Sequence, residues 1–199
     1  MTSAPKQTAA LETKASTEQM QHRETLYKLF ENTPIPTDQL IMHLGLFMRS
    51  SALAKILFLN EIYEEILDVP GSIMEFGCWL GQSLIVFENL RAINEPFNQN
   101  RRVIGFDTFE GYASISDVDG DSDVIHSGGY ALPENYPDYL RDLIAYHESN
   151  NILSHIEKHS IVQGDVVKTV PKFLKDNPGE MVALGYFDLA LYEPTKACL

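Results

Sequence analysis

Apolar side chains recur at helical spacing along the first third of the chain. Over residues 51–67 they return every three or four positions, which predicts a helix that Pro70 and Gly71 end. A capping-box pattern predicts an earlier helix over residues 16–32. A further helical pattern fits residues 37–49. The N-terminal third is therefore expected to be helical.

After this helical region, short apolar runs alternate with helical periodicity. The apolar runs predict strands at residues 73–76, 103–106, 159–163 and 181–187. Helices are expected between them, at residues 83–93, 137–147 and 169–176. Pro171 falls in the first turn of the last helix, where proline is tolerated. Strands that alternate with helices predict an α/β fold with a parallel sheet and helices on both faces.

Composition narrows the class of protein. The 199 residues are 44% hydrophobic, enough for a sizeable core, and their net charge is −13. An excess of acids argues against nucleic acid or an anionic membrane as the main partner. No apolar run approaches the roughly 20 residues that cross a bilayer, and two cysteines fit a reducing compartment. We expect a cytoplasmic protein that binds neither nucleic acid nor membrane.

The pattern also divides the chain into segments. Residues 1–15 are small and polar and are expected to form a disordered arm. Residues 16–70 are expected to form an N-terminal helical cap, and residues 71–199 an α/β domain that binds a nucleoside. The irregular stretch over residues 108–133 follows the second strand, so it is either a lid that orders on ligand binding or a solvated loop.

Each predicted strand ends in an acid or carries one just after it. These acids are Glu75, Asp107, Asp165 and Asp188. In an open parallel sheet, ligands bind at the carboxyl ends of the strands. Four acids in register therefore predict one shared site rather than four isolated helix caps.

The glycine turn after the first strand indicates which nucleoside this site binds. Gly77 and Gly81 form G-x-x-x-G, not the G-x-G-x-x-G of dinucleotide enzymes. Glu75 precedes the first glycine, where a carboxylate would repel a pyrophosphate and suit a ligand with a positive end. S-adenosylmethionine (SAM) has an ammonium, a sulfonium and no phosphate. Asp107, after the second strand, can accept hydrogen bonds from ribose hydroxyls.

Four segments together resemble the class I SAM-dependent methyltransferases, and most closely their macrocin O-methyltransferase-like family. They are residues 75–83 (EFGCWLGQS), 105–111 (GFDTFEG), 164–165 (GD) and 187–195 (FDLALYEPT). The resemblance extends from about residue 71 to the C-terminus and implies a Rossmann-like fold. Such a sheet normally has seven strands, so we expect the C-terminal strands to be missing from this chain.

The resemblance implies cofactor-binding roles for particular residues. Glu75, Gly77 and Gly81 would lie near the methionine part of SAM. Ser83 would lie at the helix N-terminus, beside the carboxylate of the cofactor. Asp107 would hold the ribose, with Thr108 beside it, and Asp165 would lie near the adenine amino group. Trp79 either stacks near the cofactor or packs in the core.

The resemblance also implies a catalytic role for Asp188, as a base, a divalent-metal ligand, or both. Mg²⁺ held there would lower the pKa of the acceptor hydroxyl. The related enzymes usually have a second acid two residues later, where this chain has Ala190, so Mg²⁺ assistance stays open. His126, in the irregular stretch, is the best histidine candidate for a base.

Together these features predict a SAM-dependent O-methyltransferase. Its acceptor would be a small hydroxylated molecule of the sugar or polyketide type, as in natural-product biosynthesis. The alternative from another class is a non-catalytic protein that uses a methyltransferase-like fold for binding or assembly, which Ala190 favours. The sequence leaves open whether the protein forms a homo-oligomer.

Overall fold

A computed structural model describes residues 15–112, 115–120 and 125–199. These residues belong to two compact units that divide between Phe58 and Leu59. The predicted disordered arm over residues 1–15 lies outside the described residues, except for Ala15. Among the helices of the described ranges, none is both long enough and apolar enough to cross a membrane.

The N-terminal unit contains helices α1 (Thr17–Glu31) and α2 (Thr37–Met42), the 3₁₀ helix η1 (Leu44–Phe47) and the start of α3 (Ser50–Glu64). Ser16 caps α1 with the capping box that the sequence predicts. The single helix expected over residues 37–49 is wrong, because the backbone leaves helical geometry at His43. The His43 ring bonds the Gln39 carbonyl at 2.8 Å, the acceptor that the His43 N–H would need to continue the helix.

The C-terminal unit is built on a parallel sheet with the strand order β3-β2-β1-β4. The strands are β1 (Ser72–Phe76), β2 (Val103–Asp107), β3 (His159–Gln163) and β4 (Val182–Phe187). Each coincides with a predicted apolar run to within one residue at either end. Glu75 lies in register with Gly105 on one side and Tyr186 on the other.

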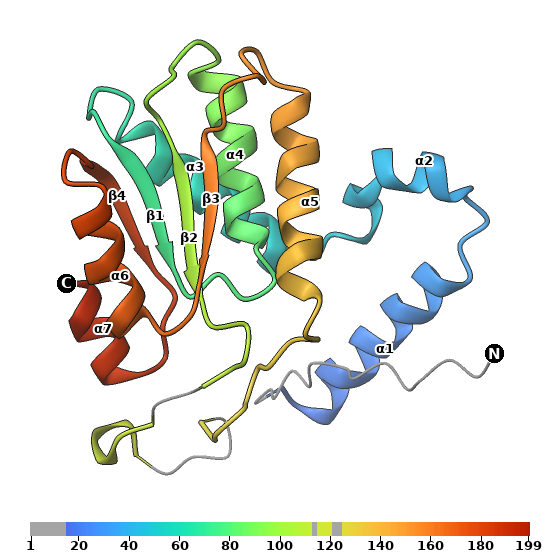
Figure 1. Cartoon of the computed structure of the whole chain (residues 1–199). Coiled ribbons are helices and arrows are strands. Elements are labelled where there is room, and N and C mark those ends of the chain that lie inside the picture. The colour runs from blue at the N-terminus through green and yellow to red at the C-terminus, as the bar shows by residue number, and fades with distance from the viewer. Residues whose placement is uncertain (1–14, 113–114, 121–124) are drawn as a thin grey trace. The chain divides into compact units, whose positions relative to one another are not determined.

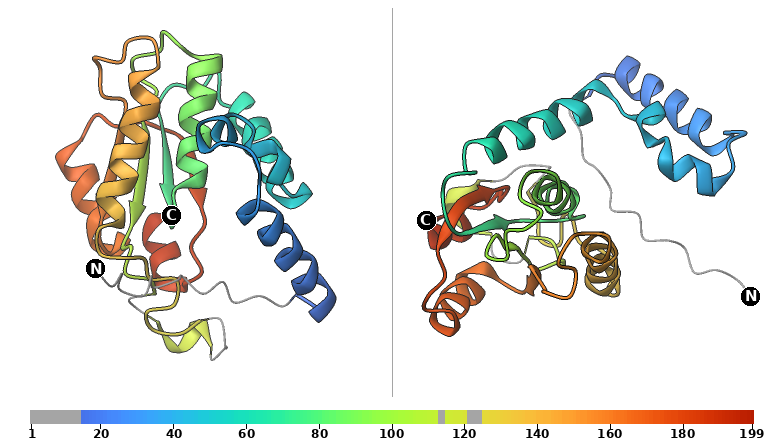
Figure 2. Two further views of the ribbon diagram at one scale, coloured as in Figure 1. Left: turned by 90° about the vertical axis from the view of Figure 1, so that its right-hand side faces the viewer. Right: turned by 90° about the horizontal axis from the view of Figure 1, so that it is seen from above.

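Helices cover both faces of this sheet (Figures 1 and 2), as the sequence predicted. The helices are α4 (Gln82–Asn94) and α5 (Tyr136–Ser149) on one face, and α6 (Val166–Asp176) and α7 (Tyr192–Cys198) on the other. Successive strand residues point to opposite faces. Ile73 therefore packs in the core cluster that contains Phe87 of α4, and Met74 in the cluster that contains Val170 of α6.

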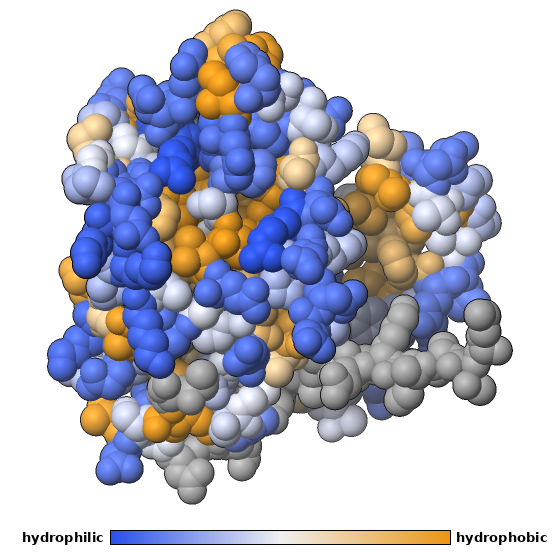
Figure 3. Space-filling model, viewed as in Figure 1, coloured by the Kyte–Doolittle hydropathy of each residue, from blue (hydrophilic) through white to orange (hydrophobic). Residues whose placement is uncertain are grey.

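The two edges of the four-stranded sheet are only partly covered. Ile161 and Val162 of the edge strand β3 are partly buried, one against each core cluster. The space-filling view shows apolar side chains gathered over β3 and hydrophilic side chains around them (Figure 3). On the opposite edge, Val182 and Phe187 of β4 are exposed. Because both edge strands are only partly covered, most of the core lies in the middle of the sheet.

Helix α6 begins three residues earlier than predicted. Asp165 is its N-cap, and the Asp165 carboxylate accepts a hydrogen bond from the Val167 N–H at 3.0 Å. Pro171 therefore lies inside the helix rather than in its first turn. A proline has no N–H, so the helix loses one internal hydrogen bond at that position. Pro171 was expected in the first turn because the helix was predicted to begin at residue 169, and Asp165 was expected in a shared site rather than at a helix cap.

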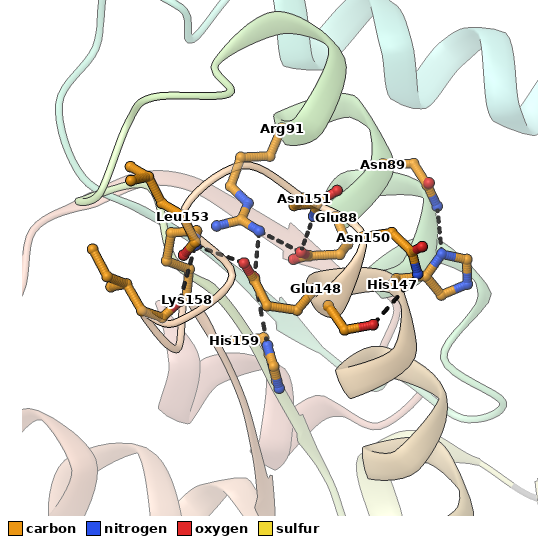
Figure 4. Close-up of polar contacts among 12 residues, drawn as sticks. Glu88, Asn89, Arg91, His147, Glu148, Asn150, Asn151, Leu153, Lys158 and His159 are labelled. Atoms are coloured by element: carbon orange, nitrogen blue, oxygen red, sulfur yellow. Dashed lines mark hydrogen bonds and ion pairs between the residues drawn. The ribbon is translucent and has the colours of Figure 1, made fainter.

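A buried ionic cluster joins the C-terminal halves of α4 and α5 to the start of β3 (Figure 4). Arg91 donates hydrogen bonds to both Glu88 and Glu148. Lys158 forms a second ion pair with Glu148, at 2.6 Å from its Nζ to Oε1, and His159 lies 3.7 Å from the same carboxylate. The side chains of Arg91 and the two glutamates are at most 5% exposed. The cluster ties α4 to α5 and to the start of β3.

Candidate functional site

A cavity of about 330 Å³ lies at the carboxyl ends of β1, β2 and β4. The chain runs from β1 to β2 and β3 on one side of the sheet, and then returns to place β4 on the other side of β1. The carboxyl ends of β1 and β4 are thus the topological switch point, where open α/β sheets bind their ligands. The cavity lies where the sequence predicted a shared site.

The turn between β1 and α4 forms one wall of the cavity. Gly77, with φ +89°, is so close to the chain after β4 that a Cβ atom would lie 2.6 Å from the Asp188 carbonyl oxygen. Gly81, with φ +76°, would bring a Cβ within 2.5 Å of Leu140 on α5. Both glycines are therefore required by the turn. Trp79 lies between them at φ +47° and lines the cavity.

Asp107 holds the two neighbouring turns in place. One oxygen of its carboxylate accepts a hydrogen bond from the Trp79 N–H and the other from the Phe109 N–H, both at 2.7 Å. Burial raises the pKa of Asp107, and these backbone N–H groups act in the opposite direction. A carboxylate has about four acceptor positions, so Asp107 can still accept hydrogen bonds from a bound hydroxyl.

Two further carboxylates complete the acidic lining. Asp165, the N-cap of α6, and Asp188, which follows β4, both line the cavity. The backbone N–H of Asp188 donates to the Phe76 carbonyl at 2.9 Å, which fixes its position beside the end of β1. The described lining residues include Asp107, Asp165 and Asp188 and contain no lysine or arginine. A site of this charge favours a cationic ligand.

The structure brings together six of the ten residues that the sequence proposed for the site. They are Gly77, Trp79, Asp107, Thr108, Asp165 and Asp188. The other four do not line the cavity: Glu75, Gly81, Ser83 and His126. Glu75 and Ser83 are buried, in β1 and in the first turn of α4. His126 is exposed, and its carbonyl accepts from the Gly129 N–H at 2.9 Å.

Two tyrosines that the sequence did not predict for the site, Tyr112 and Tyr130, form an aromatic wall of the cavity together with Trp79. The ring of Tyr130 packs against Trp79 at 5.7 Å and against Tyr112 at 5.5 Å, measured between centroids. Backbone hydrogen bonds bring the tyrosines there, because the Tyr112 N–H donates to Gly129 at 3.1 Å and the Gly128 N–H to Tyr112 at 3.2 Å. The paired glycines beside a tyrosine were the available sequence signal for a tight turn.

The segment after β4 forms the remaining wall, and it too was underestimated. Leu189, Ala190, Leu191 and Pro194 line the cavity, and of the lining residues in this segment only Asp188 was predicted from the sequence to have a role. These apolar side chains and the aromatic wall give the cavity a lining that is apolar except for its acids. Such a lining suits a purine nucleoside with a positive group.

The predicted Mg²⁺ site is not supported. The described residues hold no group of three or more His, Cys, Asp or Glu side chains that could bind a metal ion. Ala190 lies in the lining where a second acid was expected. Mg²⁺ needs several oxygen ligands in near-octahedral geometry, and the residues present do not fit it. The donor set does fit SAM, because three carboxylates surround a cavity bounded by aromatic and aliphatic side chains.

Comparison with solved structures gives two strong matches. CalS11, described as a calicheamicin methyltransferase, is 41% identical, with a TM-score of 0.90 over 100% of this chain and 77% of that chain. An apo structure of CalS11, described as a TDP-rhamnose 3′-O-methyltransferase in calicheamicin biosynthesis, is 39% identical, with a TM-score of 0.79 over 94% and 72%.

A weaker match supports the fold alone. The O-methyltransferase NovP is 22% identical, with a TM-score of 0.53 over 73% of this chain and 57% of that chain. No protein-family model and no curated protein sequence matches the chain. The assignment to a family therefore depends on the two CalS11 structures.

Proposed function

Because the chain belongs to the class I SAM-dependent O-methyltransferases, as its 41% identity with CalS11 shows, we propose that it methylates a hydroxyl group of a small sugar-containing metabolite. The observation that supports this proposal most strongly is the acidic cavity at the switch point of the sheet. Its position is that of a nucleoside site, and its charge suits a sulfonium rather than a pyrophosphate.

The residues around the cavity receive the following roles in this proposal. Asp107 accepts hydrogen bonds from the ribose hydroxyls, with Thr108 beside it, and Asp165 lies near the adenine amino group. Gly77 leaves room for the methionine part of the ligand, next to Trp79. These residues line one cavity, so a single ligand can reach all of them.

The predicted cofactor residues outside the cavity lining receive a supporting role. Ser83 is buried in the first turn of α4, where free N–H groups favour a carboxylate. Gly81 precedes that turn in a left-handed conformation. Glu75 is buried in β1 beneath the glycine turn. We propose that these three residues shape the turn that receives the methionine part.

Bound SAM supplies a methyl group on a positively charged sulfur, which leaves as a neutral thioether when an oxygen attacks. The protein must place the acceptor oxygen in line with the methyl group, about 3 Å away. It must also accept the hydroxyl proton as the new carbon–oxygen bond forms. Asp188 is the carboxylate proposed for this step, because it lines the cavity after β4. His126 is the second candidate, although it is exposed and outside the lining.

We assign the acceptor by its chemistry. One CalS11 structure is described as a TDP-rhamnose 3′-O-methyltransferase, which makes a sugar hydroxyl the first acceptor to test here. The described cavity lining carries acids and no lysine or arginine. A diphosphate would be repelled by this lining, so a nucleotide sugar would enter with only its sugar near the acids.

The test is methyl transfer from isotopically labelled SAM to TDP-rhamnose, with TDP-glucose as a second acceptor. Labelled product detected by mass spectrometry, and lost in Asp188→Asn, is the expected result. The reaction is run with Mg²⁺ and with EDTA, and equal rates are expected because the residues present do not fit a metal. SAM binding without transfer to any sugar acceptor would refute the proposed catalytic function and favour a binding protein.

A further inference from the structure

A single aspartate connects two segments that are far apart in sequence. Asp119 ends the 3₁₀ helix η2 (Asp117–Asp119) in the stretch between β2 and α5. One oxygen of its carboxylate accepts hydrogen bonds from the N–H and the hydroxyl of Ser116, both at 2.7 Å. The other accepts from the backbone N–H of Tyr192 at 2.6 Å, across 73 positions of sequence.

One of these segments belongs to the lining of the cavity. Tyr192 is the first residue of α7, and its neighbours Leu191 and Pro194 line the cavity. The hydrogen bond from Asp119 therefore fixes the backbone at a point between two lining residues. Both segments lie at the carboxyl ends of the strands, where η2 and α7 are drawn at the bottom of Figure 1.

We propose that Asp119 is a latch that fixes the start of α7 beside the cavity and so controls how long SAM stays bound. It is a positioning residue, since it acts on the cavity through the backbone of Tyr192, whose neighbours Leu191 and Pro194 line it. The inference rests on the proposed function, because the occupant of the cavity is taken to be SAM. It assigns retention of that ligand to a residue that does not line the cavity.

The chemistry of the contact suits a latch. Hydrogen bonds from Ser116 and Tyr192 hold the pKa of Asp119 below its ordinary value. The carboxylate is therefore charged at neutral pH, and hydrogen bonds to a charged group are shorter and stronger than neutral ones. Two of the three donors are backbone N–H groups, so they need no ordering of a side chain.

The surroundings of the contact allow it to open. Asp119 is only partly buried and Tyr192 is 47% exposed. Neither belongs to the buried clusters of the core. Their hydrogen bond can therefore break without unfolding either cluster, and such a local opening costs far less than unfolding the sheet. A contact with these properties can break and re-form each time a ligand enters or leaves.

The experiment compares three variants of the full chain with wild type. Asp119→Ala removes all three hydrogen bonds. Ser116→Ala removes only the hydroxyl donor and leaves the bond to Tyr192. Asp117→Ala is the matched control, because it removes a neighbouring acid of the same 3₁₀ helix. The measurements are SAM dissociation by stopped flow, KM for SAM, kcat, Tm, and hydrogen exchange of the Tyr192 amide.

Asp119→Ala is expected to speed SAM dissociation and raise KM for SAM several-fold, with a smaller change in kcat and an unchanged Tm. Its Tyr192 amide should exchange faster, Ser116→Ala should lie between it and wild type, and Asp117→Ala should match wild type. If wild type binds SAM and Asp119→Ala releases it at the rate of Asp117→Ala, the latch is refuted and the proposed function stands. If wild type binds neither SAM nor S-adenosylhomocysteine, the proposed function itself fails, and retention by Asp119 fails with it.

Discussion

Replacing Arg91 tests how the sheet and its covering helices are held together. Arg91 lies between two glutamates that its guanidinium neutralises, one on its own helix and one on α5. Its side chain is 2% exposed, and those of Glu88 and Glu148 are 1% and 5% exposed. Arg91→Leu keeps an apolar stem but leaves two buried carboxylates close together. The variant therefore removes the charge and keeps only the aliphatic part of the packing.

The expected loss of stability follows from this burial. Removing one partner of a buried ion pair costs about 3–5 kcal/mol, because the remaining charge is left uncompensated. For a domain of 150–250 residues, 1 kcal/mol lowers the Tm by about 2–4 °C. Arg91→Leu should therefore lower the Tm by roughly 6–20 °C at neutral pH. Glu148 still pairs with Lys158 at 2.6 Å, which favours the lower part of this range.

The stability lost in Arg91→Leu should also increase with pH. Burial raises the pKa of Glu88 to about 7, and the charge of Arg91 opposes that rise. A glutamate with a raised pKa contributes stability that is complete below its unfolded pKa and declines as pH rises through the folded pKa. Without Arg91 the folded pKa rises further. The difference in unfolding free energy between wild type and Arg91→Leu should therefore be smaller at pH 5 than at pH 8.

Urea unfolding at pH 5, 7 and 8 measures these differences directly. Lys172→Ala is the control, because the Lys172–Asp176 pair is exposed, at 76% and 52%, and should contribute less than about 1 kcal/mol. The double variant Glu88→Leu/Arg91→Leu should be more stable than Arg91→Leu, since it removes the uncompensated acid. If Arg91→Leu lowered the free energy of unfolding no more than Lys172→Ala does, and independently of pH, the buried cluster would contribute no more than an exposed ion pair.

The remaining predictions concern the cavity. Gly77→Val should abolish SAM binding in calorimetry while the protein stays folded by circular dichroism, because a Cβ there would lie 2.6 Å from the Asp188 carbonyl oxygen; retained affinity would contradict the placement of this turn. Asp188→Asn should lower kcat by about 100-fold or more with SAM affinity preserved, as expected for loss of a general base, and a wild-type rate would exclude that role. Tyr130→Leu should raise the KM for SAM in steady-state kinetics, since it removes the ring between Trp79 and Tyr112. Tyr139→Leu on the exposed face of α5 is its control and should leave KM unchanged.

Much of the fold could be predicted from local sequence, because its determinants are local. Short apolar runs marked the strands, and the order of acids after them placed Asp107, Asp165 and Asp188 at one edge. The errors also have local causes. The His43 ring competes for a backbone carbonyl, and the Asp165 side chain caps α6 so that the helix begins three residues before its predicted start.

The rest of the site depends on tertiary contacts that no local pattern contains. Tyr112 and Tyr130 reach the cavity because backbone groups pair across an irregular stretch. Asp119 bonds to an amide 73 residues away, and Arg91 to a glutamate 57 residues away. The sequence showed these side chains but not their partners. A chemical role could be predicted where several acids followed strands. It could not be predicted for a single residue whose partner lies far away in the sequence.

Calorimetric titration of wild type and Asp107→Ala with SAM shows whether the carboxylates at the strand ends recognise one cationic nucleoside in a single cavity. If they do, wild type binds SAM saturably at one site, and Asp107→Ala does not bind it. Equal affinity in the two proteins, or no heat and no thermal stabilisation of wild type by SAM, would contradict this recognition.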